Sequence, residues 1–62
     1  MDLNKFAMLK ATLASRDSVS IARIKADFKI SNEEAEEMLN KLIQAGLVEP
    51  FSFDGINFKV KH

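Results

Sequence analysis

Four glutamates form the densest group of reactive side chains in the sequence. Glu33, Glu34, Glu36 and Glu37 lie within one short stretch. Carboxylates in the first turn of a helix complement the helix dipole and are common on solvated faces, so they have an ordinary structural explanation. The same carboxylates would repel phosphate groups and select a basic protein partner. The sequence leaves both interpretations open.

Catalysis and metal binding find no support in the residue pattern. His62 is the only histidine and stands at the chain end, and there is no cysteine. A serine nucleophile would need a neighbouring base, and a metal site would need further ligands at suitable spacing. The two glycines mark a helix end and a turn rather than a phosphate-binding loop. We therefore expect no enzyme, no catalytic residue, no metal and no cofactor.

Basic and amide side chains are the candidates for contact with a nucleic acid. They are Arg23, Lys25, Lys29, Asn57, Lys59 and Lys61. Lys59 and Lys61 alternate with apolar residues, so they point away from the core and are free to meet phosphate. Their alternative role is solubilising charge on an edge strand.

Length and composition are those of one small domain, residues 1–62. Hydrophobic residues make up 47% of the chain, which is enough for a thin core. Nine basic residues balance nine acidic ones, so attraction to a phosphate backbone must come from a local patch. The lack of cysteine fits a cytoplasmic protein. No apolar run approaches the roughly 18 residues of a membrane span.

Apolar periodicity predicts three helices, at 2–15, 21–28 and 32–45. Gly46 is expected to end the third in the left-handed conformation. On the second, Arg23 and Asp27 have the spacing of a favourable ion pair. The expected N-caps are Asp2, Ser20 and Ser31. The expected apolar stripes are Leu3, Phe6, Leu9 and Leu13, then Ile21, Ile24 and Phe28, then Ala35, Met38, Leu39, Leu42 and Ile43.

A β-hairpin is predicted at the C-terminus. Asp54-Gly55 is a two-residue turn signal, because that turn needs positive φ at both positions. Counting back across the turn pairs Phe53 with Ile56. The next pair is Phe51 with Phe58, which would place four apolar side chains on one face.

The order of these elements predicts a winged helix of the α+β class. Two short helices joined by a tight turn form a helix-turn-helix, and the hairpin forms the wing. Val19 is expected to add a very short third strand, and Pro50 places its strand at an edge or a bulge. The alternative is a small α+β domain with no helix-turn-helix role.

Residues 19–50, VSIARIKADFKISNEEAEEMLNKLIQAGLVEP, resemble the C-terminal gamma domain of FtsK-type DNA translocases. The shared features are a Ser-Ile opening, a Phe-x-Ile turn, an alanine in the third helix and a Gly-Leu-Val-x-Pro exit. The resemblance implies a winged helix that reads DNA. Where that family has Asn and Arg for DNA contacts, this chain has the stretch 33–37, which is almost entirely glutamate. No DNA-contact residue is therefore assigned from the resemblance.

Three functional hypotheses follow. The first is a non-enzymatic winged-helix module that binds double-stranded DNA, as a small transcription regulator or as part of a DNA-handling protein. The second is a protein-interaction winged helix that docks a basic protein surface on its third helix. The third is a homodimer that covers Phe51 or Phe53. The residues expected to form the docking face in the second hypothesis are Glu33, Glu36, Glu37 and Asn40.

Overall fold

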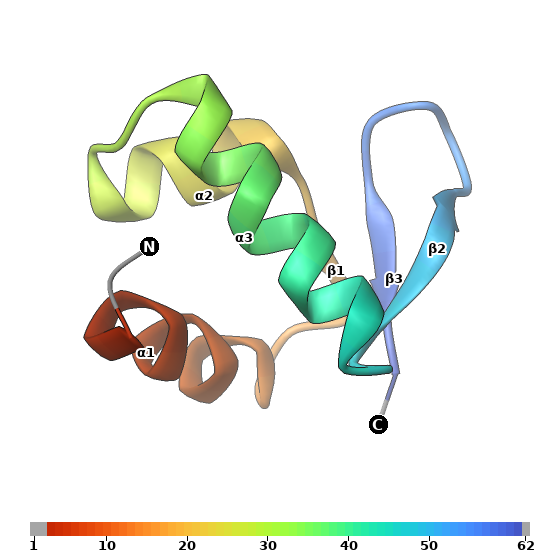
Figure 1. Cartoon of the computed structure of the whole chain (residues 1–62). Coiled ribbons are helices and arrows are strands. Elements are labelled where there is room, and N and C mark those ends of the chain that lie inside the picture. Colours follow the sequence, from red (N-terminus) through yellow and green to blue (C-terminus); the bar gives the residue numbers. More distant parts are fainter. Residues whose placement is uncertain (1–2, 62) are drawn as a thin grey trace.

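A computed structural model describes residues 3–61 and has the element order of a winged helix (Figure 1). The predicted α+β class is confirmed, with three helices, a C-terminal hairpin and a short strand at Val19. The expected N-cap Asp2 and the terminal His62 lie outside the described residues. The elements are α1 (Leu3–Leu13), β1 (Ser18–Val19), α2 (Ile21–Phe28), α3 (Asn32–Gln44), β2 (Val48–Ser52) and β3 (Phe58–Val60).

Serine caps begin the second and third helices. The Ser20 Oγ accepts a hydrogen bond from the Arg23 N–H at 3.1 Å, and the Ser31 Oγ accepts one from the Glu34 N–H at 3.2 Å. Both caps satisfy backbone donors that have no partner within the helix. They explain why α2 and α3 begin at the predicted residues.

A Schellman motif ends α3. Gly46 adopts φ 76°, the left-handed conformation in which a residue without Cβ is unstrained. Its N–H donates to the Ile43 carbonyl at 3.0 Å, and the Leu47 N–H donates to the Leu42 carbonyl at 3.0 Å. These bonds reverse the chain direction, so β2 begins soon after α3. The left-handed conformation at Gly46 agrees with the prediction from the sequence.

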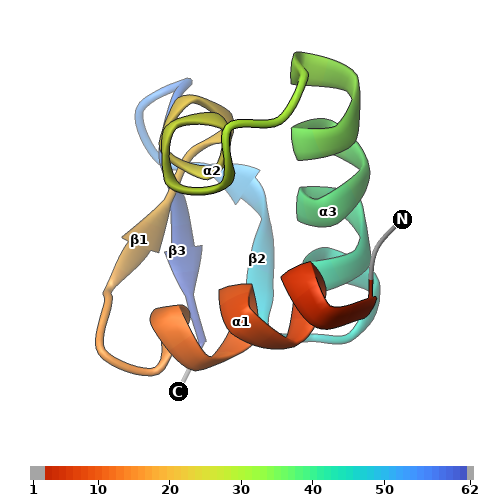
Figure 2. The same ribbon diagram turned by 90° about the vertical axis from the view of Figure 1, so that its left-hand side faces the viewer.

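The three strands form an antiparallel sheet in the order β1-β3-β2. Figure 2 shows β3 between its two neighbours, with α1 across one end of the sheet. Val19 pairs with Phe58, and Val48 pairs with Val60. β2 is therefore an edge strand, which agrees with its proline at position 50.

The predicted two-residue turn is wrong. Ser52 pairs with Phe58, the register shifts along β2, and residues 53–57 form a longer loop. Gly55 has φ 86°, but Asp54 does not have the positive φ that the short turn requires. The Asp54 carboxylate instead accepts hydrogen bonds from the N–H groups of Ile56 and Asn57, at 2.9 and 2.7 Å. This local side-chain bonding stabilises the longer loop.

Because the loop is longer, the expected apolar face of the hairpin does not form. Phe51, Phe53 and Ile56 are 80%, 65% and 65% exposed, and Phe58 is half-buried. Only Phe58 of the four packs against the core. The wing therefore presents apolar side chains to solvent.

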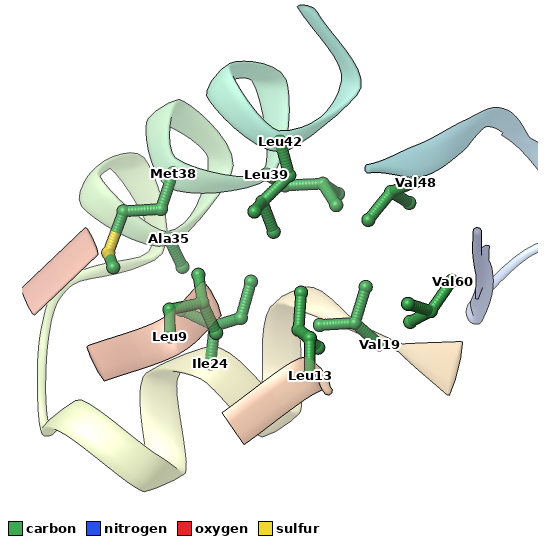
Figure 3. Packing of buried hydrophobic residues seen from close by; sticks show 10 residues of the cluster. All are labelled: Leu9, Leu13, Val19, Ile24, Ala35, Met38, Leu39, Leu42, Val48 and Val60. Atoms are coloured by element: carbon green, nitrogen blue, oxygen red, sulfur yellow. The ribbon is translucent and has the colours of Figure 1, made fainter. Parts of the chain in front are cut away.

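The core lies between the three helices and the sheet (Figure 3). The predicted stripe of α3 is buried except for Ile43, which is half-buried, and Ile24 is the buried residue of α2. Leu3 is 78% exposed, contrary to the prediction, because the first turn of α1 extends past the core. The buried residues are Leu9, Leu13, Val19, Ile24, Ala35, Met38, Leu39, Leu42, Val48 and Val60.

Candidate interaction surface

The outer face of α3 follows from its buried face. Ala35, Met38, Leu39 and Leu42 point into the core, and the intervening positions must then face solvent, given 3.6 residues per turn. The four predicted docking residues are all exposed. Figure 2 shows α3 along one side of the molecule.

The predicted docking residues share one shallow hollow, which we call the acidic face. Its lining residues are Glu33, Glu36, Glu37, Asn40, Lys41 and Gln44. The structure thus brings together the four predicted residues and adds Lys41 and Gln44. Helical spacing could have identified both, since each lies four residues after a predicted member.

The carboxylates of the acidic face are not neutralised within the described chain. Glu33, Glu36 and Glu37 form no ion pair with any of residues 3–61. The Asn32 side-chain amide donates to Glu36 Oε1 at 3.3 Å. Lys41 has the i,i+4 spacing from Glu37 but makes no ion pair with it in that part of the chain. The face therefore presents an excess of negative charge to solvent.

The six basic and amide candidates come from α2, the wing and β3. Arg23 and Asn57 line a hollow beside β1, Lys59 lines an adjoining hollow that shares Asp17 and Ser18 with it, and Lys61 lines a third hollow. Lys25 is half-buried on α2. Lys29 ends that helix in the left-handed conformation, with φ 53°.

One expected ion pair differs in the structure. Asp27 accepts a hydrogen bond from Arg16 Nη1 at 2.9 Å, so it pairs with a residue before α2 rather than with Arg23. The Asn57 side-chain amide donates one hydrogen bond to Asp54 Oδ2, at 2.8 Å, within the wing. The same loop lowers the pKa of Asp54, first through the Asn57 backbone and side-chain donors and then through the Ile56 N–H.

Within residues 3–61, no group of three or more histidine, cysteine or acidic side chains is arranged to hold a metal ion. None of the described helices has the length and apolar character needed to cross a membrane.

Comparison with known proteins gives one finding. Residues 5–50 match the PCI domain family. PCI domains mediate protein–protein contacts in multiprotein complexes. No curated protein and no solved structure matches the chain.

This finding corrects the expectations drawn from the FtsK resemblance. No similarity to FtsK-type translocases is shown, and a DNA-binding transcription regulator is not supported. The resemblance rested on core and turn residues, which any helix-turn-helix needs for packing, and it failed at the acidic stretch 33–37. The PCI domain match, by contrast, covers residues 5–50, which is well over half of the chain. The chain therefore belongs to the PCI domain family.

Proposed function

We propose that this domain is a non-enzymatic protein-interaction module that docks a basic surface of another protein on its acidic face. The observation that supports this best is the group of three exposed glutamates without ion-pair partners on one side of α3. Family membership supports the interaction role. The proposal places the resulting complex in the cytoplasm, as expected for a chain without cysteine.

The acidic face acts through charge and hydrogen bonding together. Unpaired carboxylates attract lysine and arginine side chains, raise the association rate and disfavour acidic competitors. Asn40 and Gln44 add amide groups that both donate and accept hydrogen bonds. Lysine and arginine side chains can only donate hydrogen bonds. The carboxylates therefore select a partner with positive charge, and the amides help to fix the position of that partner.

The test compares charge reversals within one helix. Glu33→Lys, Glu36→Lys and Glu37→Lys are combined, and Glu34→Lys is the matched control, because Glu34 is exposed on α3 but does not line the hollow. A binding partner is isolated from the source cells and purified, and its Kd is measured by calorimetry. Exposed charge pairs contribute about 0.2–1 kcal/mol each, and reversal adds repulsion, so the triple variant should bind roughly 10–100-fold more weakly.

The control decides between a docking face and general electrostatics. Glu34→Lys should change the Kd by less than about threefold, and both variants should keep the wild-type circular dichroism spectrum. Unchanged binding by the triple variant would contradict the proposal. So would a control variant that loses as much binding free energy per reversed charge as the triple variant.

Self-association through the wing is a second candidate, favoured by the exposure of Phe51 and Phe53. Phenylalanine contributes about 150–250 Å² when buried, so these two rings offer roughly 300 Å². A stable interface needs about 800 Å² from each partner. We therefore expect any wing dimer to be weak, with dissociation at micromolar concentration. Sedimentation of wild-type protein and of Phe51→Ser at several concentrations tests this.

A further inference from the structure

An apolar groove with lysines on both sides lies where the end of α1 meets the base of the hairpin. Its lining residues are Lys10, Leu13, Ala14, Leu47, Val60 and Lys61. Leu13 and Val60 belong to the core and form the floor, while Lys10 and Lys61 are exposed.

The groove is preformed and small. The Lys61 N–H donates to the Leu47 carbonyl at 2.8 Å, which ties the two chain segments together at this point. The volume of about 210 Å³ is below the roughly 300–1,000 Å³ of pockets that bury a drug-sized ligand. Such a groove suits one or two apolar side chains of a protein, with charged neighbours on either side.

The outer face of α1 extends this apolar surface. Leu3 and Met8 are 78% and 60% exposed, and Ala7 and Ala11 are exposed between them and the groove. A surface helix normally has a polar outer face, whereas the exposed residues of α1 are mainly apolar, with Asn4 and Lys10 as the polar ones. Its charged residues are Lys5 and Lys10, and residues 3–15 contain no carboxylate.

We propose that this surface, the groove together with the outer face of α1, binds an acidic amphipathic helix of a partner protein. Apolar side chains of that helix would enter the groove and lie along α1, and its carboxylates would meet Lys10 and Lys61. Among residues 3–61, none of the side chains that line the groove is a carboxylate, so the charge of the described lining is complementary to that of an acidic helix. The site is separate from the acidic face, and the inference does not depend on that face.

The helices α1 and α3 of a second copy of this chain are poorer occupants. Two α1 helices would bring lysines against lysines, which is unfavourable. The acidic α3 of a second copy has the right charge, but the exposed side chains of α3 are all polar and could not fill an apolar groove. A different protein with both features fits the surface better.

The test uses two synthetic helical peptides with the same leucine stripe, one with glutamate and one with lysine on its flanks. Each is titrated into the ¹⁵N-labelled full chain. The glutamate peptide should shift the amide signals of Lys10, Ala14 and Lys61 and bind at least about tenfold more tightly than the lysine peptide. Lys61→Glu should weaken binding of the glutamate peptide about tenfold. Lys59→Glu, on β3 two residues earlier, is the matched control and should change the affinity for this peptide by less than threefold.

Several results would overturn this proposal. They are the absence of binding at millimolar glutamate peptide, equal affinity for the two peptides, an equal effect of the two lysine variants, and signal shifts confined to α3 or the wing. Concentration-dependent shifts of the groove signals without peptide would show that a second copy occupies the surface, and would also overturn it. Circular dichroism of both variants establishes that they remain folded.

Discussion

Replacement of Leu42 by alanine should destabilise the domain more than most single substitutions. Leu42 is 0% exposed and packs where α3 meets the rest of the core (Figure 3). The change removes three carbon atoms, which accounts for about 2.4 kcal/mol of transfer free energy at roughly 0.8 kcal/mol per buried methylene. The cavity left behind adds to this, for a total of about 3–5 kcal/mol.

That loss is large relative to the total stability. A domain of 62 residues is expected to have an unfolding free energy of about 3–9 kcal/mol, at roughly 0.05–0.15 kcal/mol per residue. Leu42→Ala should therefore populate the unfolded state measurably, even without denaturant.

Urea denaturation followed by circular dichroism measures the effect. Leu3→Ala is the matched control, because it makes the same chemical change at a residue that is 78% exposed. The control should lose less than about 0.5 kcal/mol. A loss below about 1 kcal/mol for Leu42→Ala, or equal losses for the two variants, would refute the assignment of Leu42 to the core.

Three further predictions concern the caps and the wing. Gly46→Ala should cost about 1 kcal/mol in a urea titration, because the backbone has φ 76° and no atom lies within 4 Å of the added Cβ, which leaves conformational strain alone; Gly46→Asn should cost less. Ser31→Ala should lower the unfolding free energy by about 1 kcal/mol, through loss of the α3 cap, and a thermal scan measures this. The lowered pKa of Asp54, caused first by the Asn57 donors and then by the Ile56 N–H, stabilises the fold above about pH 3.9, the ordinary value of an unfolded aspartate. This contribution is lost as the pH falls through the folded-state pKa, so Asp54→Ala should lack that part of the acid dependence when Tm is followed between about pH 6 and 2.

The helical part of the fold was predictable because its signals are local. Ser20 and Ser31 cap helices at the expected positions, and Gly46 ends α3 as predicted. A cap depends on bonds between residues three or four positions apart, so the sequence contains nearly all the information. The exposure of Leu3 was not predictable in this way, because it depends on how far the rest of the core extends along α1.

The hairpin was harder to predict from the sequence because two local conformational preferences compete in its loop. The Asp54-Gly55 pair favours a short turn, but an aspartate that accepts hydrogen bonds from the N–H groups two and three residues later also stabilises a wider loop. Strand pairing then selects between them. Ser52 pairs with Phe58, and this register removes Phe51 from the core.

The two candidate surfaces also differ in how far local sequence signals could predict them. The acidic face was predictable because all its members lie on one helix, and their spacing places them together. The lysine-flanked groove was missed because Lys10 and Lys61 come from opposite ends of the sequence. Only the packing of α1 against the end of β3 brings them to one groove.

The exposed carboxylates of α3 are unfavourable beside a phosphate backbone, so the outer face of this helix is a poor match for nucleic acid. Packing of the helix-turn-helix constrains only the inward positions of α3, such as Met38 and Leu42, and leaves its outward positions free to vary. Fold therefore does not determine the partner, but the sign of the exposed charge restricts it. With unpaired carboxylates on α3 and lysines beside the groove of α1, the domain has two surfaces of opposite sign. A partner complementary to one surface would be repelled by the other, so the two proposals require partners of opposite charge and can be tested separately.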